Sequence, residues 1–179
     1  MAVDTYCVIV NSYDRESDAI ADYDSVRKLY TDLNIIDTYD AAVVSRKPDG
    51  KVEIVKRVEE PTRHGAVIGL AVGLAVGVAI ALFPALGVGI GVGMLGGGAA
   101  GAIVGAVTGH VARGLKRSDL KDLGETLDTG TSGLLIVAAT DVADRVNAVI
   151  KRAKKQAQAD LQADADALKR AIDDIAKTQ

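Results

Sequence analysis

The residues of this chain that could do chemistry are few: one cysteine, two histidines and carboxylates scattered along the sequence. Cys7 lies in a β-rich run with no histidine near it in sequence. Nothing local therefore lowers the pKa of its thiol, and we expect it to be a buried apolar residue. His64 and His110 stand at the two ends of a long uncharged segment. A hairpin would bring them together, either as polar caps or as a weak metal site with a pH response. Because no carboxylates show paired spacing, we predict no catalytic residues, no metal centre and no cofactor.

A glycine motif inside the same segment, Gly91-Val-Gly93-Met-Leu-Gly96, fits the G-x-G-x-x-G pattern of dinucleotide-binding turns. Such a site needs a preceding strand and an acidic residue about 20 positions further on. The next acidic residue is Asp119, which follows a basic cluster. A regular period of four explains these glycines better, so the sequence favours helix packing over nucleotide binding.

The uncharged segment runs from Gly65 to Ala112. It has 48 residues, no Asp, Glu, Lys or Arg, and 14 of the chain's 19 glycines. Ten of these glycines recur at every fourth residue, in two runs on either side of Pro84. On a helix this period forms a nearly straight stripe without side chains, which lets another backbone approach closely. The glycines predicted to pack helices and assemble copies are Gly65, Gly69, Gly73, Gly77, Gly89, Gly93, Gly97, Gly101, Gly105 and Gly109.

The lengths of the two glycine runs predict an antiparallel helical hairpin. Residues 65–83 and 89–109 make arms of 19 and 21 residues, or about 28 and 31 Å of helix, close to the roughly 30 Å of a hydrocarbon core. Basic side chains gather at the mouth of this hairpin and, by the positive-inside rule, place the body in the cytoplasm. They are Arg63, His64, Arg113, Lys116 and Arg117. Glycine contributes little to insertion, so the alternative is a hairpin buried inside a soluble homo-oligomer.

Composition narrows the class of protein. Hydrophobic residues make up 49% of the chain but aromatic residues only 3%, so the core must be aliphatic. The net charge of −3 argues against a nucleic-acid partner. A single cysteine permits no intramolecular disulfide, which suits a reducing compartment. The first residues carry no basic stretch, and we expect no signal peptide.

Around the uncharged segment the sequence predicts an α+β body. The predicted elements are a strand at 5–11, a helix at 14–33, a hairpin of strands at 41–46 and 52–58, a helix from 119 capped by Ser118, and a buried strand at 134–139. Their order, β-α-β-β-α-β with the hairpin inserted before the second helix, is that of a ferredoxin-like fold. We expect the body at 1–62 and 115–150, and the glycine-zipper insert at 63–114. Acidic residues of the first helix, Asp18, Asp22 and Asp24, are predicted to form its solvated face.

The C-terminal part of the chain, from Asp141 to about Thr178, has no Gly or Pro and predicts one long helix. Its extension at 151–179 carries Leu161, Leu168 and Ile175 every seven residues, a pattern that fits either a helix–helix contact with a protein partner or a solvated helix that packs weakly. A basic patch at its start is predicted to be solvated or to touch anionic lipid. The patch consists of Lys151, Arg152, Lys154 and Lys155.

Four short segments of the body resemble a bacterial and archaeal domain-of-unknown-function family. They are Asp40-Ala-Ala-Val-Val44, Asp49-Gly-Lys-Val52, Leu123-Gly-Glu-Thr-Leu127 and Thr131-Ser-Gly-Leu-Leu135. Members of that family are described as predicted membrane proteins with a Gly-rich hydrophobic insert at the same place, and the resemblance implies no catalytic residues. It covers residues 5 to 150. After Ile150 family members add a further strand, whereas this sequence predicts a continuing helix.

These features predict a non-enzymatic, membrane-associated homo-oligomer that assembles through glycine-zipper hairpins. Its body would face the cytoplasm at the inner membrane, and lipid would be its second partner. The alternative is a soluble cytoplasmic scaffold or adaptor, whose hairpins bundle into an apolar core, stalk or conduit for a partner complex. An enzyme would have to use His64, His110 or Cys7, which show no catalytic arrangement.

Overall fold

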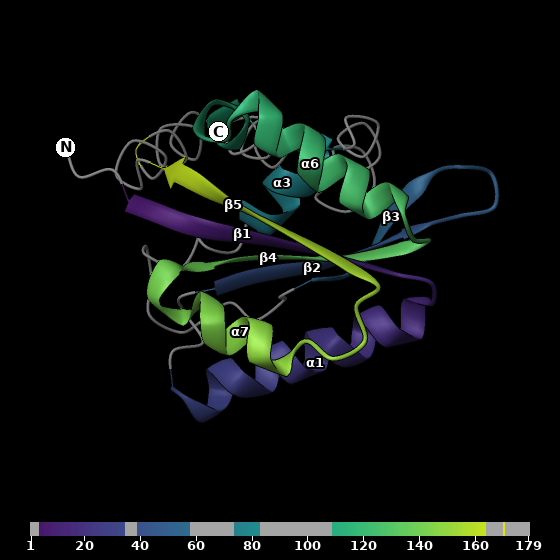
Figure 1. Ribbon diagram of the computed structural model, residues 1–179, viewed down its shortest axis with the longest axis horizontal. Helices are drawn as coiled ribbons and strands as arrows, with labels where there is room; N and C mark the ends of the chain where they lie inside the picture. Colours follow the sequence, from purple (N-terminus) through teal and green to yellow (C-terminus); the bar gives the residue numbers. More distant parts are fainter. Residues whose placement is uncertain (1–3, 35–38, 58–73, 83–108, 164–169, 171–179) are drawn as a thin grey trace, which may run out of the picture.

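The computed structural model describes residues 4–34, 39–57, 74–82, 109–163 and 170 of the chain. In these residues a five-stranded sheet, in the order β3-β2-β4-β1-β5, lies between two layers of helices (Figure 1). The elements are β1 (Asp4–Tyr13), α1 (Glu16–Asp32), β2 (Tyr39–Arg46), β3 (Val52–Arg57), α3 (Leu74–Leu82), α6 (Arg117–Asp128), β4 (Ser132–Ala139), the 3-10 helix η2 (Thr140–Val142), α7 (Ala143–Val149) and β5 (Lys155–Ala163). The chain is thus an α+β protein, as predicted.

β4 is the central strand, with β2 on one side and β1 on the other. Its apolar run is buried on both faces: Leu135 packs on the side of α3 and α6, and Ile136 on the side of α1 and α7. β1 alternates in the same way, with Val8 on the first face and Ile9 on the second. The strand at 134–139 buried on both faces is therefore confirmed.

Every pair of neighbouring strands is antiparallel. β1 and β2 therefore run parallel with β4 between them, and β4 and β5 run parallel with β1 between them. The units β1-α1-β2 and β4-α7-β5 are two interlocked split β-α-β units. The predicted order had its last strand at 134–139 and did not include this second unit. β3 extends the sheet beyond β2, and their register shifts between Val43 and Val44.

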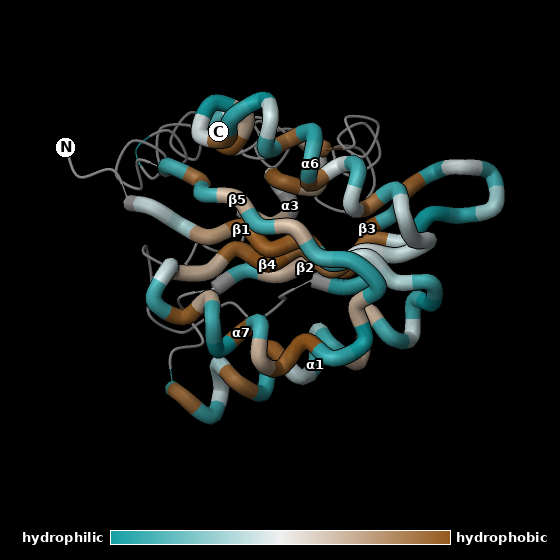
Figure 2. The backbone as a smooth tube through the Cα atoms, in the orientation of Figure 1, coloured by the Kyte–Doolittle hydropathy of each residue, from teal (hydrophilic) through white to brown (hydrophobic). Residues whose placement is uncertain are grey.

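Two hydrophobic clusters fill the spaces above and below the sheet. Figure 2 shows hydrophobic residues concentrated in the central strands and in α3, and many hydrophilic residues in α1, α6 and α7. The first cluster joins the sheet to α3 and α6; its buried members include Val8, Val10, Val44, Val78, Leu123, Leu127, Leu135, Val137 and Leu161. The second joins the sheet to α1 and α7, and includes Ile9, Tyr13, Tyr23, Val26, Tyr30, Leu134, Ile136 and Val146.

β2 and β3 form the predicted hairpin, and its turn lies at the predicted Asp49-Gly50. Gly50 has φ +83°, a left-handed conformation that glycine adopts without strain. The Lys51 N–H donates to Asp49 Oδ1 at 3.0 Å, and the Lys47 N–H donates to the Lys51 carbonyl at 2.7 Å. Helix α6 begins at Arg117 after Lys116, rather than after the predicted cap Ser118, and no side chain caps it.

The predicted long C-terminal helix is wrong for residues 150–163. α7 ends at Val149, Ile150 is extended, and residues 155–163 form β5, which pairs with β1 from Asp4 to Ser12. The physical reason is pairing: β5 satisfies the outer edge of β1 and adds Leu161 to the first cluster. The strand that the resemblance implies after Ile150 is thus present. Of the predicted heptad, Leu161 lies in β5, while Leu168 and Ile175 lie outside the described residues.

The strand assignment of β5 predicts a large effect at Leu161, which has no exposed surface. Leu161→Ala should lower the free energy of unfolding by about 2–5 kcal/mol, because it removes buried methyl groups and leaves a cavity. The exposed neighbour Gln162→Ala should change stability by less than about 0.5 kcal/mol. Denaturant unfolding of both variants checks this, and equally small effects would contradict a buried strand.

Candidate functional site

Helix α3 comes from the middle of the predicted first hairpin arm, and it packs against the sheet. Ala75, Val78 and Ala79 are fully buried in the first cluster, together with residues of β2 and β4. Gly77 is buried as well. Small side chains on this face let the helix lie close to the strands. This part of the uncharged segment is therefore built into the core of the body.

A buried carboxylate holds the beginning of α3. Asp40, in β2, is 1% exposed, and its Oδ2 accepts a hydrogen bond from the Ala75 N–H at 2.9 Å. The first N–H groups of a helix have no partner within the helix, and a negative charge there also interacts favourably with the helix dipole. Asp40 thus links the sheet to the start of α3 by a polar contact inside an apolar layer.

The far end of the uncharged segment is docked on the same face. Residues 109–114 are helical, and Val111 and Leu115 are buried in the first cluster. A Cβ at Gly114 would collide with the Gln162 carbonyl oxygen and lie 2.7 Å from Leu161 Cδ1. Glycine is therefore needed for this close approach to β5. The described residues on either side of 83–108, in α3 and at 109–115, therefore pack on the same face of the sheet.

The other predicted site residues divide into two groups. Ten of them lie outside the described residues; they are Gly65, Gly69, Gly73, Gly89, Gly93, Gly97, Gly101, Gly105, Arg63 and His64. At Gly109 an added Cβ would meet nothing within 4 Å. Arg113, Lys116 and Arg117 are exposed, and His110 is half-buried. The structure thus places three basic side chains of the predicted mouth at the surface, directly after the docked end of the segment.

Asp22 was predicted to be solvated, and this is wrong, because the structure buries it completely. Its Oδ2 accepts hydrogen bonds from the Tyr13 hydroxyl at 3.1 Å and from the Lys151 and Arg152 N–H groups at 3.1 and 2.9 Å. Its Oδ1 accepts from Arg152 Nη1 at 2.9 Å. The sequence contained a signal for this role, since Asp22 lies on the same helix face as Ala19 and Val26.

The Asp22 contacts tie α1 to the end of β1 and to the connection between α7 and β5. Nearby, Lys154 Nζ lies 2.9 Å from Asp14 Oδ1, and the Lys154 N–H donates to the Ser12 carbonyl at 2.8 Å. Arg152 and Lys154 of the predicted basic patch are therefore ion-paired. Lys151 and Lys155 are exposed. Two of the four side chains in the patch therefore stabilise the fold through ion pairs.

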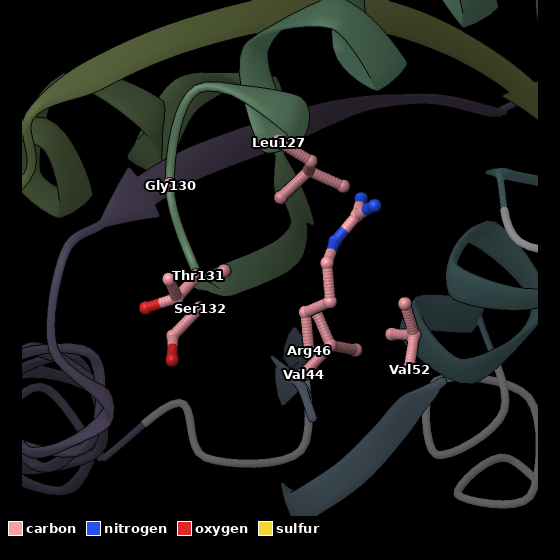
Figure 3. Close-up of a pocket in the computed structure, with 8 residues that line it drawn as sticks. Val44, Arg46, Val52, Leu127, Gly130, Thr131 and Ser132 are labelled. Atoms are coloured by element: carbon pink, nitrogen blue, oxygen red, sulfur yellow. The ribbon is translucent and has the colours of Figure 1, made fainter. Parts of the chain in front are cut away.

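A shallow hollow lies at the end of the sheet near the turn before β4 (Figure 3). Its lining residues are Val44, Arg46, Val52, Leu127, Gly130, Thr131, Ser132 and Gly133. It holds about 200 Å³, open solvent included, less than the roughly 300–1,000 Å³ of ligand clefts. The guanidinium of Arg46 donates to Asp128 Oδ1 at 2.6 Å. The hollow therefore offers neither the volume nor an uncompensated charge for a small ligand.

Within the described ranges the structure offers no group of His, Cys, Asp and Glu that could hold a metal ion. Among the helices that it describes, none has both the length and the hydropathy to span a bilayer. Cys7 is 6% exposed, as expected of an apolar residue. Burial raises the pKa of its thiol, and the charges of Asp160 and Asp144 raise it further.

These observations define a class of protein: an α+β body whose own uncharged internal helix completes one of its two cores. The chain matches, over residues 65–173, the family described as Protein of unknown function (DUF1269), and it belongs to that family. This agrees with the resemblance at the level of a domain-of-unknown-function family. Comparison with curated proteins gave no match, and comparison with solved structures gave none.

The contact between Asp40 and α3 predicts a loss of stability when the carboxylate is removed. Asp40→Ala should lower the free energy of unfolding by about 1–3 kcal/mol, because the Ala75 N–H would lose its buried acceptor. Asp24→Ala, at an exposed ion pair with Lys56, should cost less than about 1 kcal/mol. Denaturant unfolding compares the two variants, and an equal effect at both positions would contradict the role of Asp40.

The buried Tyr13 predicts a loss of stability at alkaline pH. Burial raises the pKa of Tyr13 far above its usual value, and the Asp22 carboxylate raises it further by its charge and its hydrogen bond. The unfolded chain therefore loses this proton near pH 10 while the folded chain keeps it. The stabilisation is complete below about pH 10 and falls above it, by about 1.4 kcal/mol per pH unit.

Tyr13→Phe tests this dependence. Near pH 8 the variant should be less stable than the wild type by about 1–2 kcal/mol, since Asp22 loses one donor. Above pH 10 the difference should shrink, because only the wild type has this tyrosine to ionise. Unfolding measured at several pH values between 8 and 11 checks the sign. A difference that stays constant across this range would contradict it.

Proposed function

We propose that this protein is a non-enzymatic, membrane-associated homo-oligomer whose glycine-rich segment is held on the α+β body at α3 and at residues 109–115. The observation that carries the proposal is the docking of α3 and of residues 109–115 on one face of the sheet. Residues 83–108 between them carry no charge and five of the stripe glycines, from Gly89 to Gly105, with other glycines interspersed. That face is where the protein would meet lipid and other copies of itself.

Chain length limits how this segment could enter a membrane. With α3 docked, residues 83–108 provide 26 residues, or two helical arms of about 20 Å each. Two full crossings of a core of roughly 30 Å need about 40 residues. The docked form therefore supports entry into a membrane from one side rather than a hairpin that crosses it. The exposed Arg113, Lys116 and Arg117 would meet anionic head groups on that side.

The second candidate function is a soluble scaffold or adaptor, and one observation favours it. α3 is apolar throughout, and its buried face already packs against protein rather than lipid. A helix that is hydrophobic all round belongs either in a protein core or in a membrane. Further copies could complete such a core in place of lipid. Membrane association is the property that separates the two candidates.

The body itself supports a finer classification. The two interlocked split β-α-β units, in the strand order β2-β4-β1-β5, favour a ferredoxin-like core in which β4 and β5 take the third and fourth places. β3 and the α3 and α6 layer would then be additions to it. A protein that acts as an assembly module, as proposed, needs no catalytic residues in this core.

The membrane proposal predicts the behaviour of the full chain in fractionated cells. The expressed protein should sediment with membranes, resist a carbonate wash and float with anionic vesicles in a density gradient. A cysteine at Ala85, in a Cys7→Ala background, should stay unlabelled by an impermeant thiol reagent added outside the cell, because the segment enters from the cytoplasmic side.

Two results would contradict this prediction in different ways. Labelling of the Ala85 cysteine from outside would show that the segment crosses the bilayer, so that α3 must leave the sheet. Complete recovery of the protein in the soluble fraction, without detergent, would favour the scaffold. A matched cysteine at the exposed Gln162 should be labelled after the membrane is opened, which shows that the reagent is active.

A further inference from the structure

The outer edge of β5 is a long, regular strand edge. β5 pairs with β1 over nine residues, from Lys155 to Ala163 on the β5 side, with no shift in register. Within the described residues no other strand pairs with its second edge. The opposite edge of the sheet differs, because β3 has six residues and a register shift. Short edges with bulges resist pairing with other chains, whereas long regular ones permit it.

The two faces of β5 have different compositions. Ala157, Ala159 and Leu161 point into the first cluster with α3 and α6. The residues between them are polar and exposed; they are Gln156, Gln158, Asp160 and Gln162. Figure 2 shows this mixture of hydrophilic and hydrophobic residues along the strand. A partner strand at this edge would have to place apolar residues on one face and polar residues on the other.

The sequence of β5 meets that requirement with itself, because it is nearly palindromic about Ala159. An antiparallel second copy, related by a two-fold axis normal to the sheet, would place Ala157 opposite Leu161 on the apolar face. On the polar face Gln158 would lie opposite Asp160, and Gln156 opposite Gln162. A two-fold interface is self-complementary in this way. Directly opposed pairs of this kind stabilise neighbouring strands.

Other registers fit less well. An axis through Asp160 would oppose two copies of its carboxylate, which is destabilising. An axis through Gln158 would place Lys155 opposite Leu161. An axis midway between two residues would place residues of the apolar face opposite residues of the polar face, because side chains alternate along a strand. The axis through Ala159 pairs all nine residues of β5 with their counterparts, and it matches both faces without opposing like charges.

We propose that β5 pairs antiparallel with β5 of a second copy about Ala159, so that one sheet runs through both molecules. The partner is thus a second copy of this chain, and the hydrogen bonds come from main-chain groups on the edge of β5 that no described strand pairs with. The apolar faces of the two copies join, which extends the first cluster across the axis. This contact uses none of the glycine stripes, and it stands whether or not the membrane proposal holds.

A pair of matched charge variants tests this contact in the full-length chain. Gln158→Glu and Gln162→Glu each add one negative charge, two residues from Asp160 on the same face of β5. Only Gln158→Glu faces Asp160 of the second copy, and it does so twice across the axis. It should weaken dimer formation roughly tenfold, measured by analytical ultracentrifugation over a dilution series. Gln162→Glu should leave it unchanged.

Restoring the opposite charge should restore the dimer. The double variant Gln158→Glu with Asp160→Lys places a Glu opposite a Lys in both pairs and should recover the wild-type dimer. A wild type without β5 dimers, equal weakening by both single variants, or a double variant that stays weak would each overturn the proposal. Circular dichroism of every variant confirms that the body is folded.

Two further measurements separate this contact from assembly through the glycines. Gly101→Leu, which would disturb the glycine stripe, should leave the β5 dimer intact, and Ile103→Leu serves as its matched control. In a Cys7→Ala background, mixing a Gln158→Cys chain with an Asp160→Cys chain should give more disulfide-linked dimer than either chain alone. No preference for the mixed pair would overturn the register.

Discussion

The fold depends on one constraint: the central strand β4 has apolar side chains on both faces, so both faces must be covered. Burial of apolar surface stabilises by about 25 cal/mol per Å², and a bare face would forfeit that contribution. α1 and α7 cover one face, and α3, α6 and residues 109–115 cover the other. α3 belongs to the uncharged segment, and this part of the segment is therefore a structural part of the body.

Two buried aspartates complete this arrangement, one on each side of the sheet. Asp40 accepts a hydrogen bond from the first turn of α3, and Asp22 accepts hydrogen bonds from the connection that leads into β5. In both cases a carboxylate satisfies backbone N–H groups that regular secondary structure leaves unpaired. Desolvating a carboxylate is expensive unless it is hydrogen-bonded. Asp40 thus holds the start of α3 against the sheet, and Asp22 holds the connection between α7 and β5.

Much of the body could be predicted from local patterns, because strands alternate and the Asp49-Gly50 turn has a defined chemistry. β5 could not, since Ala, Gln and Lys favour helices, and only the unpaired edge of β1 makes that segment a strand. The candidate functional site was harder to predict than the body. Hydropathy showed that α3 must avoid water, but it does not distinguish lipid from the interior of a protein. Asp22 was missed because its charge outweighed its position among Ala19 and Val26.

The central place of β4 also determines the order in which the molecule can be completed during synthesis. β1 and β2 do not pair with each other, because β4 lies between them, and Val8 pairs with Val137 far along the chain. The uncharged segment leaves the ribosome before β4 exists, and so before its docking face is assembled. At roughly 5–20 residues per second, that interval lasts several seconds. During this interval α3 has no sheet to pack against. Any other apolar environment that α3 contacts first competes with its docking on the sheet.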